Sequence, residues 1–214
     1  MAKCESDVSP RSTPRRSYHH GRLREALVKA TVELIEARGL DSVSLREVAK
    51  LAGVSSAAPF RHFPSRLALL TAVAEEAQDR LIQQIEQSLA AVEGQNALQR
   101  FRAIGRGFLL WAITNPTHFQ VISNRHIITY ETSSLRGRND QIRRQMSELM
   151  VEAAAQNLLR PGDVSAHEIG ARALVYGLAR MYVDGQFPSW GVSQPNPLDV
   201  CNAVFDQFIA SISV

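Results

Sequence analysis

The sequence predicts an all-α fold of about nine helices. Apolar residues recur at helical spacing from Arg22 to the end of the chain, and no segment alternates as a strand would. Gly, Pro, Ser and Asn stand between these stretches, where helices begin and end. The 214 residues are 45% hydrophobic, so the chain can bury a real core as one large domain or two small ones.

The first predicted helix covers 22–38 and ends at Gly39, a residue suited to a helix C-terminus. Ser44 and Glu47 have the spacing of a capping box, so a second short helix begins there. Gly53 ends it, because glycine accepts the positive φ of a tight turn at little cost.

A third short helix is predicted from Ser55 to Phe63, capped by Ser55 or Ser56. Two short helices joined by a tight turn form a helix-turn-helix, whose second helix can lie in the major groove of DNA. The segment 44–63 therefore predicts a DNA-binding head.

The remaining helices follow from the same signals. Ser65 caps a long helix that reaches about Leu89, and Asn115-Pro116 starts a short one. Ser165 with Glu168 is a second capping box, and Pro197 opens the last helix. The predicted ranges are 65–89, 96–114, a helix after 116, 139–159, 165–184 and 197–213, with loops at 124–138 and 185–196.

Positive charge is concentrated near the N-terminus. Residues 1–66 hold twelve Lys or Arg and seven Asp or Glu, whereas residues 67–214 hold twelve and fourteen. This asymmetry is the electrostatic footprint expected for contact with phosphates. The two isolated cysteines give no disulfide framework, and no apolar run reaches membrane-spanning length or resembles a signal peptide, so we expect a cytoplasmic protein.

Several segments together resemble one known family, most closely over residues 20–70. They are Tyr18-His-His-Gly, Ser44-Leu-Arg-Glu-Val-Ala, Ala49-x-x-x-Gly53-Val54-Ser55 and Phe60-Arg61-His62-Phe63-Pro64-Ser65-Arg66. In this order they are similar to the N-terminal domain of the TetR family of bacterial transcriptional regulators. The all-helical remainder agrees in length and helix count.

The resemblance implies a homodimer that binds a palindromic operator in double-stranded DNA, usually as a repressor. A small-molecule effector, here unknown, would bind the C-terminal domain and weaken DNA binding. Residues 1–17 are rich in Ser, Pro and Arg with almost no large apolar groups, and so predict a flexible basic arm. The resemblance then implies a helix-turn-helix domain (18–66) and a ligand-binding and dimerisation domain (67–214). The residues that it places at DNA are Ser44, Ser55, Ser56, Ala57, Phe60, Arg61, His62 and Arg66.

Other roles stay open for some of these residues. Phe60 could pack or contact the groove, His62 could be structural, and Arg61 suits a phosphate better than a base. Members often carry Leu where this chain has Pro59, which removes a donor if it is the fourth helical residue but is nearly harmless in a first turn.

A ligand pocket is expected among the helices between 96 and 187, where core packing is the alternative role for each large side chain. Trp111 and Tyr176 are favoured because each has a polar group that needs a partner. Arg125, Arg143 and Arg144 could meet an anionic ligand or simply be solvated. The candidates are Phe108, Trp111, Phe119, Met146, Tyr176 and Met181.

Helices 165–184 and 197–213 have wide apolar faces, and Gly170, Ala173, Gly177 and Ala179 permit close approach, so a four-helix dimer interface is expected there. No nucleophile, nucleotide-loop or metal-ligand motif is present, which argues against an enzyme, a cofactor or a metal. Two alternatives remain: a ligand-binding or protein-interaction module with a vestigial head, and a transcriptional activator.

Overall fold

The computed structural model describes residues 16–192 and 196–214, with the side chains of the first helix given from Arg22 onward. Most of the predicted basic arm and the side chains of Tyr18, His19 and His20 therefore lie outside the described residues. Within them the fold is all-α, as predicted, and its only β-pairing is an isolated bridge between Leu159 and Ser213.

Eight α-helices are present in the described part of the chain. They are α1 (Arg16–Arg38), α2 (Leu45–Leu51), α3 (Arg66–Ala90), α4 (Ala97–Thr114), α5 (Pro116–Ser123), α6 (Ser134–Ala155), α7 (Val164–Val183) and α8 (Pro197–Ile212). Four 3-10 helices join them: η1 (Leu40–Ser42), η2 (Pro59–Arg61), η3 (Arg125–Ile127) and η4 (Phe187–Trp190).

Most predicted helix ends are confirmed by their caps. The hydroxyl of Ser65 accepts from the amide of Ala68, and the side chain of Asn96 accepts from the amide of Gln99. Gly39 and Gly53 both have positive φ, 79° and 67°. The short local signals therefore decide where these helices begin and end.

Several boundaries were predicted wrongly. Helix α1 begins at Arg16 rather than Arg22, and α6 ends at Ala155 rather than Leu159. Helix α6 begins at Ser134, five residues before Asn139, because Ser133 caps it with a hydroxyl that accepts from the amide of Leu135. Helix α7 begins at Val164 because the carboxylate of Asp163 accepts from the amide of Ser165. Asp163 therefore caps this helix in place of Ser165.

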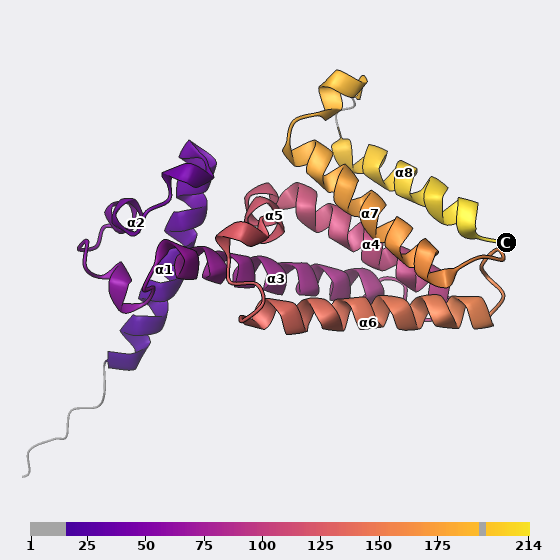
Figure 1. Ribbon diagram of the computed structural model, residues 1–214, viewed down its shortest axis with the longest axis horizontal. Coiled ribbons are helices and arrows are strands. Elements are labelled where there is room, and N and C mark those ends of the chain that lie inside the picture. Colours follow the sequence, from indigo (N-terminus) through magenta and orange to yellow (C-terminus); the bar gives the residue numbers. More distant parts are fainter. Residues whose placement is uncertain (1–15, 193–195) are drawn as a thin grey trace, which may run out of the picture.

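The core consists of two hydrophobic clusters that divide along α3. The first packs α1 and α2 against the N-terminal half of α3, up to Ala74, and the second begins at Ala77 and joins α3 to α4, α6, α7 and α8. Figure 1 shows α3 running from the head, where α1 crosses it, into the larger bundle. The head cluster also contains Val121, Ile128 and Leu135, which come from much later in the chain.

Helices α4 and α8 approach very closely at Gly105. A Cβ atom at this position would lie 2.3 Å from Cζ of Phe205, a side chain that is 1% exposed. Among the described helices, none combines the length and the apolar character needed to cross a membrane.

Candidate nucleic-acid interface and core cavity

The start of α2 is held by Ser44, whose hydroxyl accepts from the amide of Glu47 at 3.2 Å. The carboxylate of Glu47 pairs with Arg38 at 3.1 Å, so it does not complete the predicted capping box. Leu45, Val48 and Ala49 are buried on one side of α2. The opposite side carries Arg46 and Lys50, both exposed.

The predicted recognition helix from Ser55 to Phe63 is not an α-helix, which accounts for eight helices in place of about nine. In an α-helix the carbonyl of Ser55 would accept from residue 59, but Pro59 has no N–H. That carbonyl accepts from Ala58 instead, at 2.9 Å, and only Pro59–Arg61 forms a 3-10 helix. The departure noted at Pro59 therefore changes the local structure.

Five of the six predicted DNA-facing residues of this segment are exposed. Ser55, Ser56, Ala57 and Arg61 are exposed, and Phe60 is 53% exposed. Pro59, by contrast, is buried in the head. His62 is half-buried and its ring lies 6.4 Å from that of Phe63.

Arg66 has a structural role that the sequence did not indicate. Its Nε donates to the carbonyl of Val43 and its Nη2 to that of Leu40, both at 2.9 Å. The guanidinium therefore joins the start of α3 to the turn before α2. These bonds position Ser44, which follows Val43 directly.

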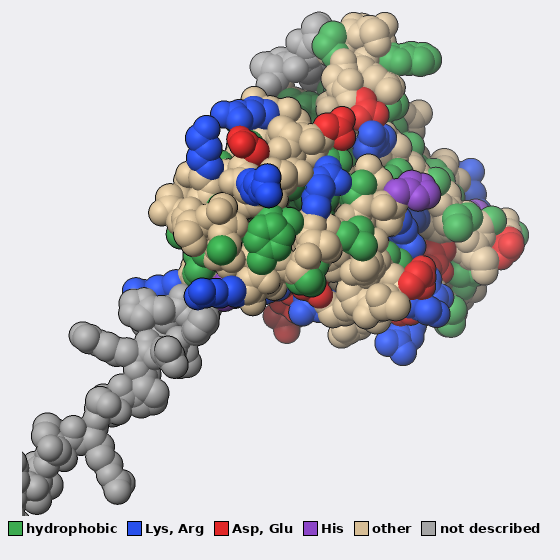
Figure 2. Space-filling model, turned by 60° about the vertical axis from the view of Figure 1, so that its left-hand side comes forward, with side chains coloured by type: hydrophobic (Ala, Val, Ile, Leu, Met, Phe, Trp, Pro, Cys, Tyr) green, Lys and Arg blue, Asp and Glu red, His purple; other side chains and the backbone are tan. Residues whose placement is uncertain are grey.

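The exposed cations of the head differ in their pairing. Lys29 and Arg38 make ion pairs with Glu33 and Glu47. Arg46, Lys50 and Arg61 make none with any described residue, and sequence reasoning missed the first two because a lone cation on a helix gives no motif. Figure 2 shows Lys and Arg side chains distributed over this face, with hydrophobic side chains exposed between them.

The larger bundle contains a cavity of about 220 Å³ between α3, α4, α5, η3, α6 and α7. Four of the six predicted pocket residues line it: Phe108, Trp111, Phe119 and Tyr176. Met146 and Met181 do not; both are half-buried and pack against the core cluster.

Several polar groups that the sequence did not single out also line this cavity, among them Gln78, Tyr130, Asn139 and Arg172. Gln78 lies on α3 and is 3% exposed, and its Nε2 donates to the carbonyl of Leu135 at 3.2 Å. A lone polar residue within an apolar helical pattern was the only signal that could have indicated it.

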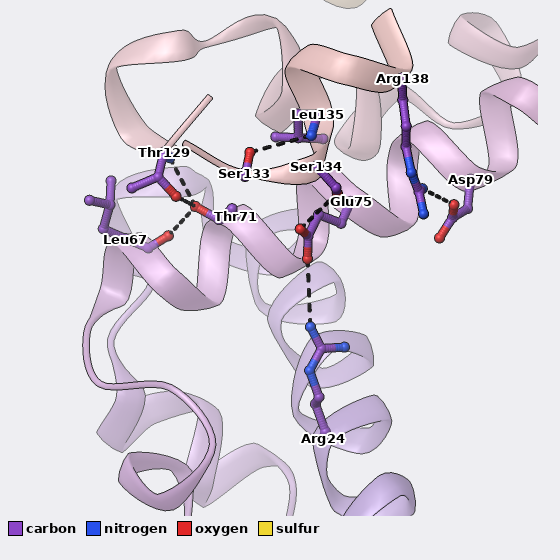
Figure 3. Close-up of polar contacts among 10 residues, drawn as sticks. All are labelled: Arg24, Leu67, Thr71, Glu75, Asp79, Thr129, Ser133, Ser134, Leu135 and Arg138. Carbon is purple, nitrogen blue, oxygen red and sulfur yellow. Dashed lines mark hydrogen bonds and ion pairs between the residues drawn. The ribbon is translucent and has the colours of Figure 1, made fainter. Parts of the chain in front are cut away.

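Polar contacts connect the cavity region to the head through α3 (Figure 3). The hydroxyl of Thr71 donates to the carbonyl of Leu67 and lies 3.0 Å from the hydroxyl of Thr129, whose amide donates to Thr71. Glu75 accepts from the Ser134 hydroxyl at 3.0 Å and pairs with Arg24 of α1 at 3.7 Å. Segments on either side of the cavity-lining residue Tyr130 thus touch α3 near the head.

A helix-turn-helix head with exposed cations, joined by one long helix to an all-α bundle with an internal cavity, defines a DNA-binding regulator of the helix-turn-helix class. The family model for bacterial regulatory proteins of the tetR family matches residues 27–73. A second family model, for the tetracyclin repressor-like C-terminal domain, matches residues 101–211, about half of the chain. The chain belongs to the TetR family.

Individual relatives agree with this assignment. The nucleoid occlusion factor SlmA of Vibrio cholerae is 28% identical over 140 residues, which cover 65% of this chain and 70% of SlmA. A Rhodococcus protein of unknown function has a solved structure with TM-score 0.75 and 28% identity, covering 94% of this chain and all of that one. The ketosteroid regulator KstR2 of Mycobacterium tuberculosis has the same fold, with TM-score 0.69 at 18% identity, covering 90% and 95% of the two chains.

Proposed function

We propose that this protein is a homodimeric repressor that binds a palindromic operator and is released when a small molecule occupies the cavity lined by Trp111 and Tyr176. The observation that carries the proposal is that the cavity and the head are joined by one helix, α3, to which Thr129 and Ser134, on either side of the cavity-lining Tyr130, are hydrogen-bonded. A ligand that favours one arrangement of these segments shifts the population of DNA-binding conformations.

DNA contact is assigned to the surface formed by the exposed side of α2 and the segment 55–61. Arg61, Arg46 and Lys50 bind phosphates, and Phe60 contacts the groove edge from its exposed position. Arg66 acts indirectly, because its guanidinium is already bonded to two carbonyls. Two heads related by a two-fold axis contact half-sites about 34–36 Å apart.

Dimer formation is assigned to α7 and α8. Ile169 is 71% exposed on α7, Ala173 is exposed one turn later, and a Cβ at Gly177 would meet no atom within 4 Å. Residues four apart share one helix face, so these three make a stripe that a second copy can approach closely. Val204 of α8, 37% exposed, adds to it, whereas Gly170 already packs on Phe208 within the chain.

The DNA-binding part is tested by footprinting on the region upstream of the protein's own gene, at several salt concentrations. Arg61→Ala should weaken binding to a protected palindrome and reduce the salt dependence by about one phosphate contact, because it removes a cation. Arg143→Ala, an exposed cation on α6, is the matched control and should bind as the wild type does. Equal binding by both variants would refute this use of the head.

The dimer is tested by light scattering coupled to size-exclusion chromatography. Ala173→Glu should give a monomer that no longer protects the full palindrome, because a carboxylate would be buried without a partner in the helix interface. Ala37→Glu on exposed α1 is the control and should remain a dimer. A dimeric Ala173→Glu variant would exclude this face.

A further inference from the structure

The cavity contains buried polar atoms that have no protein partner. Nε1 of Trp111 and Oε1 of Gln78 make no hydrogen bond, although the two residues are only 2% and 3% exposed. An unmade hydrogen bond in a buried place is costly, and native structures seldom keep one. The first atom is a donor and the second an acceptor, so a hydroxyl group can satisfy either.

Two guanidinium groups line the same cavity. Arg125 lies over the ring of Tyr130 at 3.6 Å, and Arg172 lies 4.8 Å from the centre of the Phe108 ring. Neither forms an ion pair with a carboxylate of the described residues. Both residues keep exposed surface at the mouth of the cavity, yet desolvation lowers the pKa of Arg172, and the charge of Arg125 lowers it further against the opposite influence of two tyrosines. The site therefore has excess positive charge that an anion would neutralise.

The rest of the wall is aromatic. Phe108, Trp111 and Phe119 contact one another with ring centroids 5.9–6.1 Å apart, and Tyr176 extends the set at 5.6 Å from Phe119. A volume of about 220 Å³ corresponds to about seven water molecules in the liquid. It admits a single ring with short substituents.

We propose that the effector is a compact hydroxylated aromatic carboxylic acid. Its carboxylate binds between Arg125 and Arg172, its ring packs on Phe108 and Phe119, and its hydroxyl bonds with Trp111 or Gln78. This inference rests on the proposed function, because it takes the cavity to be the effector site. It adds the charge and size of the ligand.

The test measures binding without DNA. Trp190→Phe is the background, because Trp190 is 73% exposed and its removal leaves Trp111 as the single tryptophan reporter. The probes are 4-hydroxybenzoate, benzoate and the uncharged 4-hydroxybenzamide. Tryptophan fluorescence and the thermal unfolding midpoint measure their binding. The carboxylate should bind at least about tenfold more tightly than the amide, because it forms charge-assisted hydrogen bonds.

Arg172→Gln should remove the preference for the carboxylate, and Arg144→Gln, an exposed residue that does not line the cavity, should preserve it. The hydroxyl group should bind through Trp111 or Gln78. Either Trp111→Phe or Gln78→Leu, each followed by thermal unfolding, should therefore reduce the difference in affinity between 4-hydroxybenzoate and benzoate. Failure of every carboxylate to bind, equal binding of acid and amide, or a preference that survives in Arg172→Gln would overturn the inference.

A separate operator-release assay distinguishes the two proposals. Acid binding without release of DNA would support the ligand class and refute release by occupancy of this cavity. Release by an uncharged compound, with no acid bound, would support the proposed function and refute the ligand class.

Discussion

The close approach of α4 and α8 makes Gly105→Ala the most direct probe of this bundle. The new Cβ would lie 2.3 and 2.4 Å from Cζ and Cε1 of Phe205, whereas carbon atoms prefer about 3.5–4.0 Å. Phe205 is 1% exposed, so its ring cannot move into solvent to relieve the clash. Either the ring leaves its preferred position or the helices separate.

The magnitude follows from two opposing effects. Overpacking a core costs about 1–3 kcal/mol, and this overlap belongs near the upper limit. Alanine is favoured over glycine within a helix by about 1 kcal/mol. The free energy of unfolding should therefore fall by about 2 kcal/mol, and the midpoint by roughly 4–8 °C for a chain of this size. Denaturant titration and thermal unfolding followed by circular dichroism measure the two quantities.

Two further variants make the result interpretable. Gly137→Ala in α6 is the matched control, because its Cβ would meet no atom within 4 Å and it should stabilise the protein slightly. Phe205→Leu removes the end of the ring, so the double variant with Gly105→Ala should be more stable than the sum of the single changes predicts. A Gly105→Ala variant as stable as Gly137→Ala would refute the tight crossing.

Three further outcomes are expected. Arg66→Ala should lower the free energy of unfolding by about 1 kcal/mol, because the part-buried carbonyls of Val43 and Leu40 each lose a hydrogen bond from the guanidinium, and unchanged denaturation would contradict that role. Asp206→Asn should cost roughly as much, since Arg102 and Arg106 both donate to this carboxylate, and urea titration at pH 7 tests it. His118→Gln should reduce the loss of stability below pH 6.5: burial, followed by the charge of Arg80, lowers the pKa of His118, so the folded state resists protonation. Unfolding midpoints across that pH range would show an unchanged slope if this explanation is wrong.

Local signals in the sequence predicted much of the fold. The caps at Ser44, Ser65 and Asn96 and the turn at Gly53 all act within a few residues, so they can be recognised without knowing the tertiary structure. Competition between neighbouring caps was harder to judge. Asp163 precedes the predicted cap of α7 by two residues and takes its place.

The candidate sites depend on distant pairs, and there sequence reasoning was less complete. Four predicted aromatic residues do line one cavity, because large side chains on facing helices gather in the core. Arg172 and Gln78 are separated by almost a hundred residues, and no spacing rule brings them to the same cavity. Pro59 was recognised as a departure, but whether it would be harmless or disruptive depended on which serine began the turn.

The head core has a consequence for recombination between regulators. Val121, Ile128 and Leu135 complete the cluster formed by α1, α2 and the first half of α3. The core of the DNA-binding head is therefore not built from one contiguous stretch of chain. A crossover that joined residues 1–74 to an unrelated sensor would leave three gaps in that cluster. Chimaeras should retain specificity and stability only when these side chains travel with the head, which makes the unit of inheritance larger than the DNA-reading motif.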